Sequence, residues 1–193
     1  RRRHTRYISV TGVQTCALPI SGGATGLNFA LRPANSLHKE IGLKALVGDN
    51  GRANVSLFRI DVSDEIVVNS NAGGRSDFKN VQGTRREGLE FGYAHKLPLG
   101  FETALSYTLL NARFTQPFTT VTGTPSVAVA VPAGSKLPGI AGNNLYCELV
   151  WRYPQYGFHA GVEVRHSGKV WVNDQNSDRK STRLNSSHTD ISR

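Results

Sequence analysis

The chain has 193 residues and a formal net charge of +9, from 23 Lys and Arg against 14 Asp and Glu. A basic balance of this size would suggest a nucleic-acid partner. Eight of the basic and two of the acidic residues, however, lie in residues 1–20 and 178–193, so residues 21–177 keep 15 and 12, a net charge of +3. This central part gives no reason to expect nucleic-acid binding, and we expect no nucleic-acid partner.

The two ends of the chain are related as DNA rather than as protein. Residues 178–193 can be encoded by a sequence whose reverse complement, read in frame, encodes residues 5–20 without a mismatch. Selection on a protein has no known reason to produce such agreement, and the inner parts of both ends resemble translated short-read library adapter. We therefore predict that residues 1–20 and 178–193 are adapter-derived artefacts without regular structure. Residues 21–177 are then a fragment with both natural termini missing.

Alternation of apolar and polar residues predicts strands within the fragment, and no apolar run reaches the ~18 residues of a membrane helix. The alternation comes in segments of about ten residues, and a tilted membrane-spanning strand needs ~9 to 11. The predicted fold class is all-β, an antiparallel up-and-down meander in which each strand pairs with the next. The six strands are expected near residues 38–47, 51–62, 84–96, 101–114, 143–153 and 156–167.

The later four segments each have one apolar face and one face of charged or small residues, because successive side chains of a strand point to opposite sides. The apolar positions include Leu89, Phe91, Leu105, Tyr107, Leu149, Trp151, Val162 and Val164. The opposite positions include Glu90, Glu102, Glu148, Arg152, Glu163 and Arg165. In a membrane barrel the first set would face lipid on the convex side. The second would line a hydrated lumen, where Glu148 or Arg152 should pair with Arg165 or Glu163.

The connections alternate strictly between short and long. Tight turns are predicted at residues 48–51, 97–100 and 154–157, and long polar links at 63–83 and 115–142. Outer-membrane barrels combine short periplasmic turns with long extracellular loops, whereas a soluble sandwich has no reason to keep this order. Three aromatic residues also lie beside the short turns, where an interfacial girdle belongs: Phe101, Tyr153 and Phe158.

Five stretches, taken together and in order, resemble the barrel of TonB-dependent outer-membrane receptors. They include EIGLK, FRIDVSDEI, RREGLE and KLPG, and occupy residues 31–45, 56–67, 80–93, 105–114 and 134–178. The resemblance implies an incomplete segment of a ~22-stranded barrel in the bacterial outer membrane. It also implies energy-coupled import of a ferric siderophore or a similar scarce nutrient. The expected partners are membrane lipid, that small ligand, and the TonB system acting through a plug domain absent from this chain.

The only candidate ligand-binding residues are Arg85 and Arg86, at the extracellular rim, where they could attract an anionic ligand. The alternative is a charged rim without a ligand. Asp64 and Glu65 are interpreted as solvated acids where a strand leaves the membrane. The histidines have no metal-site spacing and no nucleophile and base can be assembled, so we expect no metal, no cofactor, no catalytic residue and no enzyme.

Two other functional classes remain possible from the sequence. A soluble β-sandwich that binds a ligand or carbohydrate would require the apolar faces to pack against each other. A barrel enzyme would require a catalytic group at one rim. A fragment of six to eight strands cannot close a ~22-stranded barrel, so its edges would be unpaired. We expect that the fragment does not fold alone and has no function of its own.

Overall fold

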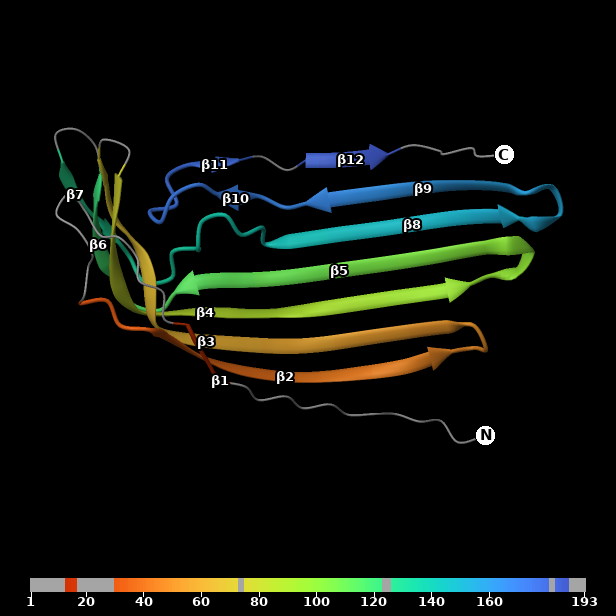
Figure 1. The fold of residues 1–193 in the computed structure, drawn as a ribbon, viewed down its shortest axis with the longest axis horizontal. Coiled ribbons are helices and arrows are strands. Elements are labelled where there is room, and N and C mark those ends of the chain that lie inside the picture. Colours follow the sequence, from red (N-terminus) through yellow and green to blue (C-terminus); the bar gives the residue numbers. More distant parts are fainter. Residues whose placement is uncertain (1–12, 17–29, 73–74, 123–125, 181–182, 188–193) are drawn as a thin grey trace.

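The computed structural model describes residues 13–16, 30–72, 75–122, 126–180 and 183–187. These residues form one curved ten-stranded sheet, antiparallel except for one parallel contact between β3 and β6, and a separate two-stranded sheet (Figure 1). Two short 3₁₀ turns, η1 (Pro98–Gly100) and η2 (Pro154–Tyr156), connect strands at one end. The strands are β1 (Val13–Cys16), β2 (Ala34–Val47), β3 (Gly51–Ala72), β4 (Arg75–Lys96), β5 (Phe101–Phe114), β6 (Phe118–Thr122), β7 (Val127–Val131), β8 (Asn143–Tyr153), β9 (Phe158–Ser167), β10 (Val170–Trp171), β11 (Arg179–Lys180) and β12 (Arg183–Ser187).

The predicted meander is confirmed, because β2, β3, β4, β5, β8 and β9 pair in sequence order. The tight connections are formed as expected. In the η1 turn, Leu99 and Gly100 have positive φ, and a Cβ added to Gly100 would collide with the carbonyl oxygen of Arg152. Only glycine fits there, since it has no side chain to clash. In the described part of the chain, no helix is long and apolar enough to cross a membrane.

The register places the predicted apolar residues on one face of the sheet, called here the apolar face. Directly opposed residues share a face. Leu89 therefore lies beside Leu57 and Leu109, and Phe91 beside Val55 and Tyr107. The row continues through Leu145, Cys147, Leu149 and Trp151 of β8 to Val162 and Val164 of β9. The predicted charged residues Glu90, Glu102, Glu148, Arg152, Glu163 and Arg165 lie on the other side, the polar face.

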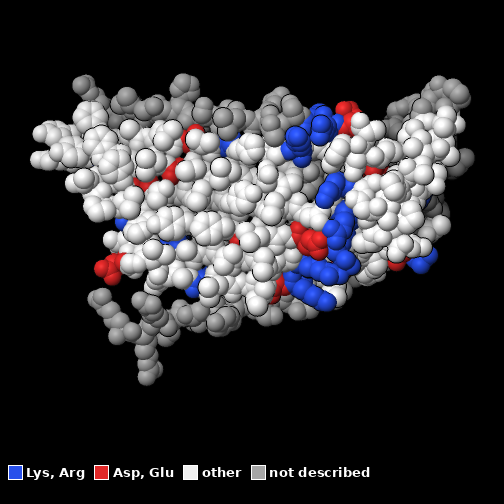
Figure 2. Space-filling view, turned by 180° about the vertical axis from the view of Figure 1, so that it is seen from behind, with Lys and Arg blue, Asp and Glu red and all other residues white. Residues whose placement is uncertain are grey.

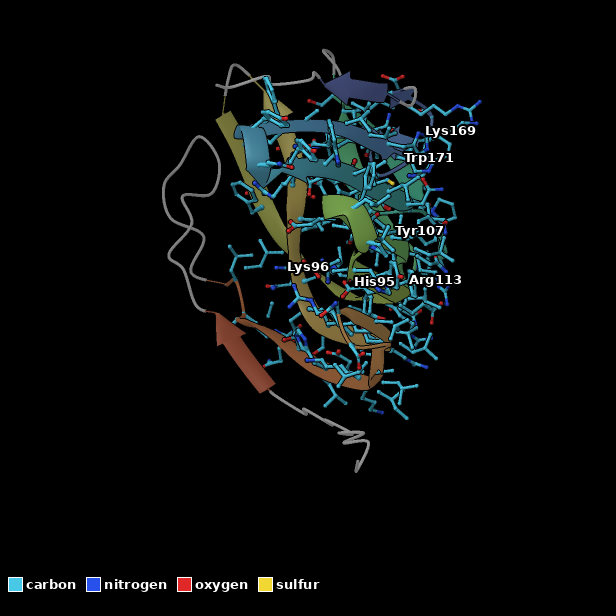
Figure 3. All side chains as sticks on the ribbon, turned by 90° about the vertical axis from the view of Figure 1, so that its right-hand side faces the viewer. His95, Lys96, Tyr107, Arg113, Lys169 and Trp171 are labelled. Carbon is cyan, nitrogen blue, oxygen red and sulfur yellow. The ribbon has the colours of Figure 1, made fainter. Side chains whose placement is uncertain are left out.

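Figure 3 shows the two faces from the end of the strands. Tyr107 and Arg113 point to one side of the sheet, and Lys96 points to the other. The apolar face is not covered by other described residues, so its large side chains are open: Ile41 is 65 % exposed, Leu57 53 % and Val162 53 %.

The link expected at residues 63–83 is mostly strand. The ladder between β3 and β4 continues to Ala72 and Arg75, with an irregularity between Val68 and Ser70. At Asp64, φ is +55°, and here the alternation of faces is broken. Glu65 bonds to Thr84 on the polar face, although Asp61, also odd-numbered, bonds to Arg85 on the apolar face. β3 thus continues past Asp64 and Glu65 as far as Ala72.

The side chain of Asn80 holds this irregularity in place. Its Nδ2 donates to the carbonyl oxygen of Asp64 at 2.7 Å and to that of Arg32 at 2.8 Å. The backbone N–H of Arg32 donates to Asn80 Oδ1 at 2.8 Å. One amide thus satisfies three backbone groups, one at the interruption of β3 and two in the segment just before β2.

The link at residues 115–142 also contains structure. β6 and β7 form a hairpin, and Val121 of β6 pairs in parallel with Ser70 of β3. Beneath this hairpin lies a small buried core, in which Phe114 is 2 % exposed and Val131 0 %. Its other members are Val81, Ala112 and Leu137. Residues 138 and 139 form a turn, with Gly139 at φ +77°.

The prediction that both ends lack regular structure is wrong for the residues described there. β1 pairs with β2, β12 pairs with β9, and β11 pairs with β10. The physical reason is that β2 and β9 would otherwise be open edges, and backbone N–H and C=O groups at an edge accept almost any extended segment. Pairing of this kind does not depend on side chains and so does not test the adapter origin.

Candidate functional site

The two predicted ligand-binding residues point to opposite faces. Arg85 lies on the apolar face, where its Nε donates to Asp61 Oδ1 at 2.6 Å. Arg86 lies on the polar face, where its guanidinium binds both oxygens of Glu65, at 3.2 and 3.3 Å. Consecutive residues of a strand cannot serve one site, because their side chains alternate. Only Arg86 remains near a hollow that could hold a ligand.

Arg86 is already paired with a carboxylate. Thr84 donates its hydroxyl to Glu65 Oε2 at 2.6 Å, and Arg86 Nη1 contacts the same hydroxyl at 3.1 Å. Arg86 and Glu65 are 24 % and 22 % exposed. A two-point Arg–carboxylate pair of this kind fixes geometry and leaves little net charge. Arg86 therefore provides a fixed polar group rather than a free cation.

A hollow of about 680 Å³ lies beside this pair, at the end of the sheet away from the tight turns. It is enclosed by segments far apart in the sequence: the extension of β3, the β6 strand, the turn after β7 and the segment after β10. Its polar lining comes from Glu65, Asn69, Arg86, Thr120, Asn173, Asp174 and Gln175. Its apolar lining includes Val67, Phe114, Leu137, Ile140 and Val172. Apolar walls with a few convergent polar groups are typical of small-molecule sites.

Contacts between loops hold the walls of this hollow together. Gln175 Nε2 donates to Thr120 Oγ1 at 3.2 Å, joining the last segment to β6. Asn176, with φ +56°, accepts the Lys136 N–H at 2.5 Å and donates to the Lys136 carbonyl oxygen at 2.9 Å. Phe114 meets Phe118 edge to face, with ring centroids 4.7 Å apart. The hollow is therefore a built feature of the loop end.

Asp174 is the titratable group of the hollow that the sequence did not single out. Burial raises the pKa of its carboxyl above the ordinary value. It lines the same hollow as Glu65 only because segments far apart in the sequence come together there, which no local pattern reveals. Glu65 was noted from the sequence, but as a solvated acid rather than as the partner of Arg86.

A second hollow, of about 600 Å³, lies on the polar face near the tight turns. It is lined by Arg52, His95, Lys96, Glu102, Glu148 and Arg152 among others. The expected cross-strand pairs are not formed, because the η2 turn sets Glu148 opposite Glu163. Arg152 instead lies 3.5 Å from Glu102 on β5, and Arg165 pairs with Glu163 on its own strand. The predicted pairing is wrong because the register between β8 and β9 brings other residues together. The predicted face of these charged residues is correct.

The described residues contain no group of three or more His, Cys, Asp or Glu side chains close enough to hold a metal ion. The aromatic residues beside the tight turns do gather. Trp151 stacks on Tyr153 and on Phe101, and Tyr153 stacks on Tyr156. The Trp151 Nε1 donates to the carbonyl oxygen of Leu99 at 3.1 Å. The cluster thus has an apolar body and a satisfied polar end, as expected of residues at an interface.

The family model described as TonB dependent receptor-like, beta-barrel, matches residues 7–192. The chain belongs to this family. The match reaches into both ends that the sequence suggested to be adapter-derived, so the adapter origin stays a prediction.

Three solved structures of TonB-dependent receptor type have a fold similar to that of this chain. The FrpB iron transporter from Neisseria meningitidis (F3-3 variant) has a TM-score of 0.59 and 14% identity, covering 86% of this chain and 25% of that protein. The BauA ferric preacinetobactin receptor from Acinetobacter baumannii has a TM-score of 0.59 and 15% identity, covering 93% of this chain and 25% of that protein. The copper transporter OprC has a TM-score of 0.65 and 16% identity, covering 93% of this chain and 27% of that protein. This TonB-dependent receptor chain thus spans about a quarter of the structures it matches, and at these identities the likeness shows the fold alone.

Proposed function

We propose that this chain forms part of the barrel wall of a receptor in the bacterial outer membrane, which imports a ferric siderophore or a similar scarce nutrient. In this proposal the apolar face meets lipid and the polar face lines the lumen. The tight turns lie on the periplasmic side, and the extension of β3 and β4 projects outside the cell. The TonB system would act through a plug domain of the complete receptor.

The single observation that carries the proposal is the contrast between the two faces of one layer of strands. On the apolar face, rows of large side chains cross all six meander strands without a covering layer among the described residues. From Asn143 to Tyr153 the exposed band measures about 25 Å, for ten residues of ~3.3 Å tilted by ~40°. That height matches the apolar band of outer-membrane barrels. Lipid is the one surrounding that makes such a face favourable.

The ligand is proposed from two sources. The relatives named above are an iron transporter, a ferric preacinetobactin receptor and a copper transporter, so a metal or a metal complex is the ligand class they suggest. The hollow at the loop end offers apolar walls with Arg86, Glu65 and Asp174 as polar groups. These features suit a metal chelate with an organic shell better than a bare metal ion, which would need several converging ligands.

The test uses the complete receptor that contains this segment. Purified in detergent, it is titrated with a panel of ferric siderophores, with cupric and cuprous salts, and with iron-free siderophores. We expect tight binding of at least one ferric siderophore and weaker binding of its iron-free form. Uptake of that ferric siderophore by cells should also stop when TonB is deleted. Binding of copper salts alone would mean that the ligand is copper and not a siderophore. Uptake that does not require TonB would contradict energy-coupled import.

The soluble β-sandwich remains the alternative, but nothing in the described residues favours it. A sandwich needs a second sheet against the apolar face, and the only other sheet described is the two-stranded pair of β10 and β11. The proposal contains no catalytic step. Fractionation of cells expressing the complete receptor separates these possibilities, since a soluble module would not remain in the outer membrane after an alkaline wash.

We also propose that residues 1–20 and 178–193 come from translated adapter, leaving residues 21–177 as the receptor fragment. The in-frame complementarity of the two ends supports this origin. Sequencing the source transcript tests it, because an adapter origin requires complementary codons at both ends and a different continuation of the gene beyond each junction. Ends whose codons are not complementary would overturn it.

A further inference from the structure

The apolar face ends abruptly in a row of charged side chains on the loop side. Ile41, Leu57, Leu89 and Leu109 lie side by side, and the next outward-pointing row is Lys39, Arg59, Glu87 and Asn111. The row beyond that contains Asp61, Arg85 and Arg113, and Arg113 is bridged to Lys136. Figure 2 shows the result as a column of Lys and Arg that bounds a broad, largely uncharged surface.

This column, called here the cationic belt, carries a surplus of positive charge. Its cations are Lys39, Arg59, Arg85, Arg113, Lys136 and Lys169, and Figure 3 shows Lys169 pointing to the same side as Arg113. Its acids are Asp61 and Glu87. Six cations against two acids leave a net charge of +4. The polar face at the same level carries apolar residues, Phe58, Ile60, Leu110 and Ala112, together with His38, Glu40 and Arg86.

The two acids hold the cations in place more than they neutralise them. Asp61 accepts from Arg59 at 2.8 Å and from Arg85 at 2.6 Å. Glu87 accepts from Arg113 at 2.8 Å and from Asn111 at 3.2 Å, and Asn111 in turn accepts from Lys136. Each guanidinium keeps N–H groups that these bonds do not use, since five are available and one or two are engaged. The belt therefore presents fixed guanidinium groups, which suit the oxygen atoms of phosphate.

The position of the belt restricts what can approach it. It lies on the same face as the apolar band and directly at its edge, so a ligand that binds there also touches the band. A phosphate attached to acyl chains satisfies both conditions, whereas a soluble anion uses only the charge. Basic clusters at a membrane surface attract anionic headgroups in this way. An acidic protein partner would not benefit from the adjoining rows of Ile and Leu, which lie at the level of lipid tails.

We propose that the cationic belt binds the phosphate groups of anionic lipids in the outer leaflet, and so fixes the depth of the barrel wall in the membrane. This inference rests on the proposed membrane location but not on the imported ligand. The lipid phosphates lie against the Arg and Lys side chains, and the acyl chains run along the row from Ile41 to Leu109. The short aromatic cluster at the tight turns marks the other edge of the same band.

The test replaces two lysines of the belt. Neither of them pairs with an acid among the described salt bridges, so their replacement leaves no carboxylate without its partner. The belt variant is Lys39→Glu with Lys169→Glu, and the matched control is Lys44→Glu, which lies five residues from Lys39 on the same strand but on the polar face. The complete receptor in non-ionic detergent is titrated with lipid A, which carries two phosphates and acyl chains, and with its dephosphorylated form. Native mass spectrometry counts the bound lipid, and inorganic phosphate is added as a competitor.

We expect the belt variant to bind lipid A about tenfold more weakly or worse, since two favourable charges become unfavourable. The control should bind like the unchanged receptor, and the dephosphorylated lipid should bind weakly to all three. Equal affinity in belt variant and control would overturn the proposal, as would equal binding of both lipids. Displacement by millimolar inorganic phosphate would show an anion site without lipid preference and also overturn it.

Folding is monitored separately, by the heat-dependent migration of each variant in gels. A receptor that assembles in membranes but shows no phosphate-dependent lipid binding would contradict only the belt. A receptor that never assembles in membranes would contradict the proposed membrane location instead. The two failures are therefore distinguishable.

Discussion

The two ends of the sheet are stabilised in different ways. At the loop end, the extension of β3 and β4, the β6–β7 hairpin and the following turns enclose their own buried core around Phe114 and Val131. Toward the tight turns, the described strands contribute no residue to this core, and apolar-face side chains such as Leu43 and Val162 are 42 % and 53 % exposed. The loop end thus has a protein interior, while the turn end leaves its apolar side chains uncovered by other described residues. Two strands, β4 and β5, contribute residues to this core and continue to the tight turns.

The largest expected effect lies in the loop-end core. Phe114→Ala removes a side chain that is 2 % exposed and should cost about 3–5 kcal/mol of local stability. Hydrogen exchange of β6 and β7 amides in the complete receptor measures it, and exchange in β8 and β9 should hardly change. Val127→Ala is the control, because Val127 is 57 % exposed on the same hairpin. Equal protection in both variants would show that the loop end has no core of its own.

At the turn end, the corresponding test is a charge on the apolar face. Leu149→Arg should cost about 2–4 kcal/mol if it lies near the bilayer midplane. Glu148→Gln, one residue away on the polar face, should have little effect because that face is hydrated. The yield of folded complete receptor in lipid vesicles compares the two. Equal tolerance, or the reverse order, would contradict the assignment of faces.

The tight turns allow a smaller, paired comparison. Gly100→Ala should be destabilising by about 1–3 kcal/mol, because positive φ is combined with a collision against the Arg152 carbonyl. Gly48→Ala shares the positive φ, but its new Cβ has no atom within 4 Å, so its cost should be about 1 kcal/mol. Urea unfolding of the complete receptor in vesicles measures both. A Gly48 variant that is as unstable as the Gly100 variant would exclude the collision as the cause.

The smallest effect concerns Asp174 at the loop end. Burial raises the pKa of this carboxyl above the ordinary 3.8, so the folded state prefers the protonated form. Its contribution to stability is therefore fully present below pH 3.8 and is lost as the pH rises through the raised value. Asp174→Asn should leave stability unchanged at pH 3 and increase it slightly at pH 7. Unfolding curves of the variant and the unchanged receptor at the two pH values compare their stabilities. A variant that is less stable at pH 7 would mean that the charged carboxylate has a favourable partner.

The sequence predicted the turn end well because its pattern is local. Alternation around Leu105 and Tyr107 is enough to assign strand and face, and Pro98 and Gly100 are enough to assign a turn. The register across η2 was not predictable, since a shift of one residue changes which charges meet. Arg85 and Arg86 could have been separated by alternation alone, because adjacent residues of a strand cannot share a face.

The loop end was predicted poorly because its order comes from distant contacts. The alternation of β3 breaks at Asp64, so the pattern beyond it no longer agrees with the strand before it and suggests a loop. The side chain that repairs this break, Asn80, lies 16 residues away. The hollow with Arg86 and Asp174 likewise forms only when segments from β3, β6 and the end of the chain come together.

The clamp formed by Asn80 also has a mechanical consequence. Its amide grips Arg32 through both the N–H and the carbonyl of that residue, just before β2 begins at Ala34. A pull on the chain that precedes β2 therefore loads these hydrogen bonds first, and the force passes into the long β3–β4 ladder instead of peeling β2 from its edge. Bonds loaded together resist tension better than bonds broken one at a time. A single asparagine can in this way protect the first wall strand from any traction exerted through the preceding chain.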